Sequence, residues 1–197
     1  MKALVSRVRN LLLRPGAEWQ LIRDEPTTYL NILLRYVGIL AVIPPIAAIL
    51  GRVLFHSNIP DSALSSSFGY LVLTNALWYV MYVVNVVITG AVIAAVLVTT
   101  ESRWSGLAGL KIAAYSFTPL FAAGFLAVIP HMAWSVPIVI GYGVYLMYLG
   151  IRALTAVSRT GAIGYTAASF LAAAVIVGVM NLFEYYFESL VVKQLFL

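Results

Sequence analysis

The chain has 197 residues, of which 62% are hydrophobic and 10% are charged, and its formal net charge is +5. A soluble domain is usually about half apolar and a quarter charged, so a soluble fold of this length could not hide so much apolar surface from water. The composition excludes a soluble globular protein and predicts that lipid solvates much of the chain. The absence of cysteine excludes disulfides, thiolate metal sites and thiol catalysis.

Residues 1–29 are predicted to form a cytoplasmic amphipathic segment. Apolar residues between Leu4 and Leu12 recur at helical spacing, Pro15-Gly16 ends this helix, and a second short turn is expected over residues 17–22. A basic amphipathic helix of this kind lies on an anionic leaflet, and packing under the bundle as a structural foot is a compatible alternative. The basic residues that would bind the membrane surface are Lys2, Arg7, Arg9 and Arg14.

Five downstream segments are long and apolar enough to cross a membrane, since about 30 Å of hydrocarbon takes about 20 helical residues. Turn residues such as Asn58-Ile59-Pro60-Asp61 separate the segments, and none of the loops could hold another domain. The predicted fold is an all-α polytopic transmembrane helix bundle with a short N-terminal interfacial helix, and residues 30–197 form one domain. The expected spans cover residues 30–55, 68–98, 110–129, 134–154 and 164–187.

Most of the 12 lysine and arginine residues fall in the N-terminal segment and in the loops that follow the second and fourth spans. Lys111 is placed in the loop between the second and third spans. By the positive-inside rule these segments are cytoplasmic, which with five spans places the N-terminus in the cytoplasm and the C-terminus in the periplasm. Topology explains this spread of basic residues better than a polyanionic partner does, so we expect no nucleic-acid binding.

The second span carries polar residues on one helical stripe. Asn75, Trp78, Tyr82, Asn85 and Thr89 follow one another at alternating intervals of three and four residues. The two amides lie about 15 Å apart along the helix axis, which suits a polar path better than one small ligand. Hydrogen bonding between helices, at about 1 kcal/mol or less per pair, is the other interpretation.

Prolines are expected to break two spans. Pro44-Pro45 in the first span removes helical donors, and Pro119 in the third span does the same for the carbonyl of Tyr115. Broken helices build transporter sites, although single kinks are also ordinary features of membrane bundles. The residues of a candidate intramembrane polar path are therefore Asn75, Tyr82, Asn85, Thr89, Pro44, Pro45, Tyr115 and Pro119.

Titratable residues collect on the predicted outer face, where His56, His131 and Glu184 are weak metal candidates. They belong to no recognised ligand motif, and separate solvated residues are the simpler interpretation. The sequence has no phosphate-cradling glycine loop, serine elbow or His-Glu metal helix. We therefore expect no enzymatic activity, no metal and no cofactor.

Three stretches carry a family resemblance: Arg14-Pro15-Gly16-Ala17-Glu18-Trp19 with Asp24-Glu25-Pro26, Trp104–Lys111 with Ala114–Pro119, and Tyr148–Leu154. They resemble the Yip family, the small five-span proteins first known as partners of Ypt/Rab GTPases, in its bacterial inner-membrane branch. The resemblance covers nearly the whole chain and implies five helices, a cytoplasmic N-terminus, an inner-membrane location and a non-enzymatic role. Eukaryotic members act in vesicle traffic and membrane shaping, but this chain has only residues 1–29 before its first span, which argues against GTPase binding.

Two functions remain open from the sequence. The first is a membrane-organising or adaptor protein, with the lipid bilayer, an unidentified membrane protein or further copies of itself as partners. The second is a small transporter or oligomeric channel that uses the polar stripe and the proline-broken spans. Five helices are few for a carrier built from paired repeats, so the first function is favoured.

Overall fold

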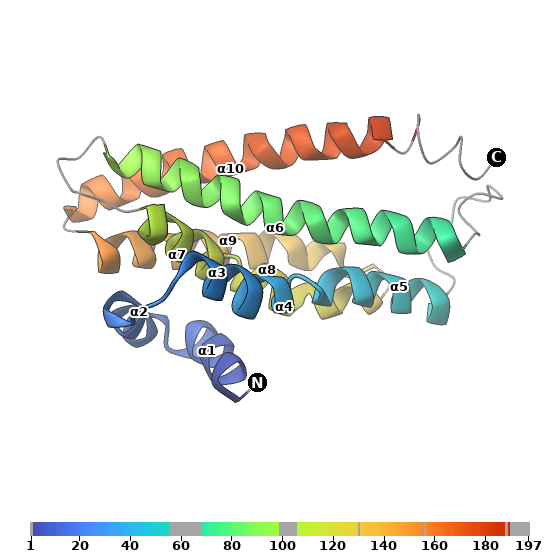
Figure 1. Ribbon diagram of the computed structural model, residues 1–197, viewed down its shortest axis with the longest axis horizontal. Coiled ribbons are helices and arrows are strands. Elements are labelled where there is room, and N and C mark those ends of the chain that lie inside the picture. The colour runs from blue at the N-terminus through green and yellow to red at the C-terminus, as the bar shows by residue number, and fades with distance from the viewer. Residues whose placement is uncertain are drawn as a thin grey trace.

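The computed structural model describes residues 2–55, 68–98, 106–129, 131–155, 157–187 and 189. Long helices run side by side in one bundle, and the described residues contain no strand (Figure 1). Five helical segments are long and apolar enough to cross a membrane, which confirms the predicted all-α transmembrane fold. They cover Tyr29–Phe55, Phe68–Leu97, Gly106–Val128, Val136–Leu154 and Arg159–Phe187.

The first and third spans are interrupted where the sequence predicted. In the first span α4 ends at Leu40 and α5 begins at Ile43, just before Pro44-Pro45. In the third span α7 ends at Ser116, and α8 begins at Thr118 with Pro119 in its first turn. The first span consists of α3 (Tyr29–Ile32), the π-helix η1 (Leu33–Val37), α4 (Gly38–Leu40) and α5 (Ile43–Phe55). The third consists of α7 (Gly106–Ser116), α8 (Thr118–Ala123) and the 3₁₀ helix η2 (Gly124–Val128).

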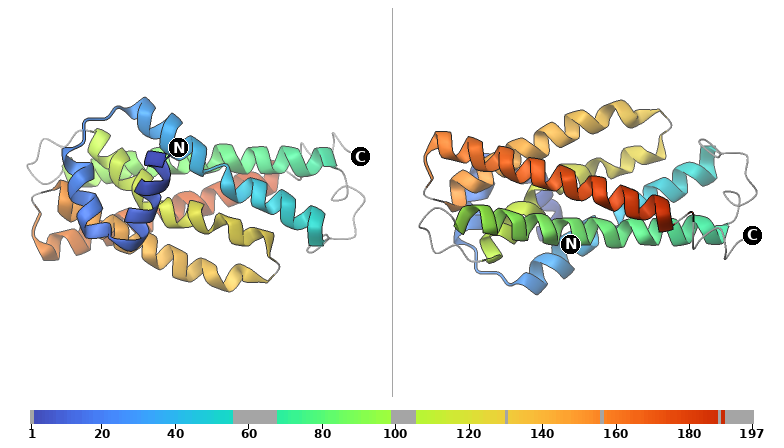
Figure 2. Two further views of the ribbon diagram at one scale, coloured as in Figure 1. Left: turned by 90° about the horizontal axis from the view of Figure 1, so that it is seen from below. Right: turned by 90° about the horizontal axis from the view of Figure 1, so that it is seen from above.

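Helix α6 (Phe68–Val98) is the centre of the bundle, and its closest neighbour is α7. The two backbones meet at Gly90 and Gly109, where a Cβ added to Gly109 would lie 2.3 Å from the carbonyl oxygen of Gly90. After the 3₁₀ helix η3 (Met132–Ser135), α9 (Val136–Leu154) returns and α10 (Arg159–Phe187) packs along α6 and α9. Helix α9 diverges from α10 toward the end away from the N-terminal helices (Figure 2).

Helices α1 (Lys2–Leu13) and α2 (Pro15–Asp24), called here the N-terminal helix pair, cross one end of the bundle (Figures 1 and 2). Pro15 separates them, as predicted, but the second helix is longer than the short turn expected. The Tyr142 hydroxyl on α9 donates to the carbonyls of Leu11 and Leu12, at 3.2 and 2.9 Å. Trp19 is fully buried against Gly150, where an added Cβ would lie 2.7 Å from its ring. The pair is therefore packed onto the bundle.

Candidate functional sites

An ion-pair cluster joins α1 to α2. The guanidinium of Arg7 bonds to the Glu18 carboxylate at 2.7 Å and to the carboxylate of Glu25, and the Asn10 amide donates to Glu18 at 2.9 Å. Glu18 is only 4% exposed, so these donors offset the cost of burying its charge. Arg7, which the sequence assigned to the membrane surface, is paired with two carboxylates of the N-terminal segment, and its contact with the membrane stays a prediction.

The other three predicted surface residues, Lys2, Arg9 and Arg14, are exposed on the N-terminal helix pair. This leaves their membrane contact a prediction.

Lys111 fixes the end of α2 to the bundle. The sequence placed Lys111 in a loop, but it lies within α7, is 8% exposed, and donates to the carbonyls of Ile22 and Glu25, both at 2.8 Å. These carbonyls belong to the last turn of α2 and the residue after it, where carbonyl groups lack helical partners and the helix dipole favours a cation. Lys111 therefore acts as a C-terminal cap supplied by another helix.

A cluster of aromatic rings lies above the ion pairs. The ring of Tyr115 lies 4.7 Å from that of Tyr36 and 6.0 Å from that of Trp19, and the Arg7 guanidinium lies 5.8 Å from its centre. The Tyr36 hydroxyl bonds to the Thr118 hydroxyl at 2.6 Å. Beside this cluster is a cavity of about 490 Å³, called here the basic cavity. Its lining includes Arg7, Glu25, Asn31, Arg35, Tyr36, Tyr115, Leu4, Ile32 and Ile39.

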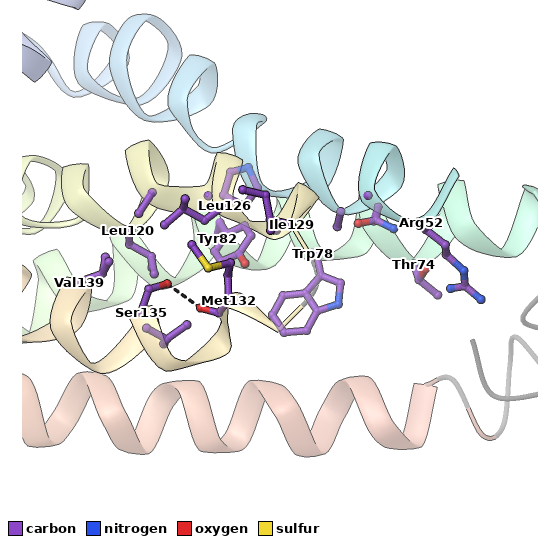
Figure 3. A pocket seen from close by; sticks show the side chains of 18 of the residues that line it. Arg52, Thr74, Trp78, Tyr82, Leu120, Leu126, Ile129, Met132, Ser135 and Val139 are labelled. Atoms are coloured by element: carbon purple, nitrogen blue, oxygen red, sulfur yellow. Dashed lines mark hydrogen bonds between the residues drawn. The ribbon is translucent and has the colours of Figure 1, made fainter. Parts of the chain in front are cut away.

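A second cavity, of about 580 Å³, lies toward the opposite end of the bundle between α5, α6, η2, η3 and α9 (Figure 3). Asn75, Trp78 and Tyr82 from the predicted stripe line it, together with Pro44, and we call it the stripe cavity. The rings of Trp78 and Tyr82 are 5.7 Å apart. Part of the predicted polar path therefore faces one cavity.

The rest of the predicted path does not reach the stripe cavity. Asn85 and Thr89 are buried, and the Thr89 hydroxyl donates to the Asn85 side-chain oxygen at 3.0 Å within α6. Tyr115 lines the basic cavity, which shares no lining residue with the stripe cavity. The two remaining residues, Pro45 and Pro119, are buried and line neither cavity.

Helix α8 lies between the two cavities. Its Thr118 bonds to Tyr36, which lines the basic cavity, and its Phe121 ring contacts Tyr82, which lines the stripe cavity. Phe121 is fully buried. The path predicted from the sequence is therefore divided into two cavities with a packed layer between them.

Of the three weak metal candidates, only His131 has a described side chain, and it lines the stripe cavity. Its φ of 64° places it in the left-handed region, at the turn before η3. His56 lies outside the described residues, and nothing is described of the Glu184 side chain. Within the described residues, no three histidine or acidic side chains are grouped as metal ligands.

Comparison with known proteins decides the family. The Yip1 domain matches residues 9–180, which include α2 and most of all five spans. The chain belongs to the Yip1 domain family. The inner membrane protein YohC of Escherichia coli K12 is 27% identical over 170 residues, covering 84% of this chain and 87% of YohC. YohC of E. coli O6:H1 strain CFT073 matches equally, and no solved structure matches. This Yip1 domain protein is therefore an integral membrane protein with an inner-membrane relative.

Proposed function

We propose that this Yip1 domain protein is a non-enzymatic membrane-organising or adaptor protein of a bacterial inner membrane, with its N-terminal helix pair on the cytoplasmic side. The observation that carries the proposal is the fixed position of the pair. Lys111 and Tyr142 join the pair to the bundle through hydrogen bonds, Trp19 is buried against α9, and the ion pairs of Arg7 hold α1 to α2. A rigid platform of this kind presents one surface to the leaflet or to a partner without having to fold on contact.

The outward surface of the pair combines basic and apolar side chains. Val5, Leu13 and Leu21 are 61–67% exposed. Lys2 and Arg9 of α1 are exposed as well, and so is Arg14 between the two helices. Apolar residues that enter the headgroup region and lysine or arginine that contact anionic lipid are the features of interfacial helices. This composition supports contact with the surface of an anionic leaflet.

Neutralising the exposed basic residues should weaken the preference for anionic lipid. The chain has no cysteine, so Ser6→Cys in exposed α1 accepts a single donor dye. In proteoliposomes, energy transfer to labelled phosphatidylglycerol should exceed transfer to labelled phosphatidylcholine. Each basic residue near an anionic surface contributes about 1 kcal/mol, so Lys2→Gln/Arg9→Gln/Arg14→Gln should reduce this excess several-fold.

The matched control is Arg52→Gln, which removes one positive charge from α5 near the opposite end of the bundle. The excess transfer to phosphatidylglycerol should stay unchanged in this variant. Equal transfer to both lipids in the wild-type protein would contradict leaflet recognition by the helix pair.

The stripe cavity supports a second function, that of a small transporter or oligomeric channel. Asn75 and Tyr82 place polar groups in a cavity of a size typical of ligand sites.

If the protein is such a transporter or channel, glycerol should enter proteoliposomes faster than it enters protein-free vesicles, and Asn75→Leu should slow its entry several-fold. Asn85→Leu is the comparison variant, because Asn85 lies outside the cavity. Stopped-flow light scattering measures both rates, and glycerol entry at the protein-free rate would leave only the first function.

A further inference from the structure

Arg35 lies in a position where a charge is costly. It belongs to the first span, roughly 9 Å from the start of that helix, and it lines the basic cavity. Within the described residues its guanidinium makes no ion pair or hydrogen bond. Charged residues inside membrane segments mark functional sites and pair with an opposite charge, so Arg35 calls for an anionic partner from outside the described chain.

Tyr115 lines the same cavity. Tyr115 is 6% exposed, and its ring is held by Tyr36, Trp19 and Arg7, but its hydroxyl has no hydrogen-bond partner among the described residues. The hydroxyl oxygen is not fully enclosed by protein atoms, so it can bond to water or to a ligand. Tyr115 therefore supplies a hydroxyl group at the α7 wall of the cavity.

The balance of charge in the cavity favours an anion. Its charged lining residues are Arg7, Arg35 and Glu25, and Glu25 is already paired with Arg7. Among the lining residues Arg35 is left without an acidic partner, and the second carboxylate bound to Arg7, that of Glu18, lies outside the lining. Arg35 is carried by the π-helix η1 (Leu33–Val37), an irregular element that occurs frequently at functional sites.

The cavity also has an apolar side that continues toward lipid. Leu4 and Ile32 line it, and so does Ile39, which is 46% exposed on the first span. A soluble anion would gain nothing from these side chains. A phospholipid has a phosphate for the polar side and an acyl chain for the apolar side, and basic pockets beside transmembrane helices bind lipid head groups.

We propose that the basic cavity binds the phosphate of an anionic phospholipid from the leaflet that contacts the N-terminal helix pair. Arg35 and the Tyr115 hydroxyl donate to the phosphate oxygens, and Ile39 contacts the first part of an acyl chain. This site rests on the proposed function and specifies its lipid. It differs from the outer surface of the pair, because the cavity lies between α1, the first span and α7.

Native mass spectrometry of the full chain in detergent micelles tests the site with three probes: phosphatidylglycerol, phosphatidylcholine and inorganic phosphate. One molecule of phosphatidylglycerol should remain bound, with weaker retention of the other two. Arg35→Gln should weaken phosphatidylglycerol binding about tenfold or more, because it removes a charged hydrogen-bond donor. Tyr115→Phe should weaken it less and keeps the ring contacts. Arg35 is exposed and Tyr115→Phe deletes only one hydroxyl, so both variants should fold, which a melting curve checks.

Arg52→Gln serves as the charge control and should bind phosphatidylglycerol like the wild type. Equal retention of phosphatidylglycerol and phosphatidylcholine, or an Arg35→Gln variant with wild-type binding, would overturn the proposal. Tighter binding of inorganic phosphate would assign the cavity to a soluble anion instead and overturn the lipid site. If the dye-transfer experiment still shows excess anionic lipid, only this site fails. If that excess is absent too, the proposed function fails with it.

Discussion

Gly109→Val should force α7 away from α6 and destabilise the whole bundle. A Cβ at Gly109 would lie 2.3 Å from the carbonyl oxygen of Gly90 and 2.9 Å from both the Cβ and the backbone nitrogen of Ala94. Backbone atoms cannot move aside as a flexible side chain can, so the helices must separate along their longest contact. Overpacking of this kind costs about 3 kcal/mol, which corresponds to a fall of about 6–12 °C in melting temperature for a chain of this size.

The matched control is Gly178→Val in α10, where an added Cβ would meet nothing within 4 Å. The same change of side chain at this lipid-facing position should leave the melting temperature within about 2 °C of the wild type. Thermal unfolding in detergent, followed by circular dichroism, measures both variants. Similar melting temperatures for Gly109→Val and Gly178→Val would show that the close approach of α6 and α7 is not needed for stability.

The spans were predictable because burial in lipid imposes a simple rule on sequence. Every backbone group must bond within its own helix, so about 20 apolar residues in a row suffice to identify a span. The breaks at Pro44-Pro45 and Pro119 were predictable for a related reason, since proline lacks the donor that the helix needs. The third span begins at Gly106 rather than residue 110, because a helix needs only backbone hydrogen bonds and can include glycines that the sequence pattern treats as turn residues.

The polar contacts were less predictable because they depend on which helix faces which. The spacing of Asn75, Tyr82 and Asn85 placed them on one stripe, but it could not show that Asn85 bonds to Thr89 within α6. The sequence placed Lys111 in a loop, whereas the structure buries it within α7 against a partner. That partner is a pair of backbone carbonyls in α2, and backbone carbonyls leave no trace in side-chain patterns.

Arg7 illustrates the same limit. The helical pattern of α1 places basic residues away from the apolar face, and it treats Arg7, Arg9 and Arg14 alike. Their different roles follow from α2, which brings the Glu18 and Glu25 carboxylates to Arg7 alone. A pattern within one helix predicts its faces, but the partner of each face is decided by tertiary packing.

Lys111→Met should release the N-terminal helix pair while leaving the five spans folded. Methionine keeps the approximate length of the side chain but removes the ammonium group that bonds to the carbonyls of Ile22 and Glu25. Hydrogen bonds to charged groups contribute about 1.5–3 kcal/mol each, and the two share one donor group, so we expect a loss of about 3 kcal/mol at α2. Hydrogen exchange of the α2 amides should then become about a hundredfold faster.

Arg23→Gln is the control on the same helix. The Arg23 side chain donates to Asp24 at 2.8 Å and holds the pKa of the Asp24 carboxyl below its usual range. A carboxyl whose pKa is lowered by folding stabilises the folded state above its unfolded pKa, and this stabilisation is lost as the pH falls through the folded pKa. Both groups are fully exposed, so water and salt screen this pair and exchange at α2 should not change.

Slow exchange at α2 in Lys111→Met would mean that Trp19 and Tyr142 are sufficient to hold the helix pair. The platform would then depend on the packing of Trp19 and the hydrogen bonds of Tyr142 rather than on the lysine cap. The basic cavity would keep its α1 wall in that variant. Fast exchange at α2 together with weaker phosphatidylglycerol binding would instead show that the lysine cap supports the basic cavity. The reason is that Arg7 and Leu4 of α1 form part of the cavity lining. The same variant therefore tests whether the lysine cap maintains the lipid site as well as the helix pair.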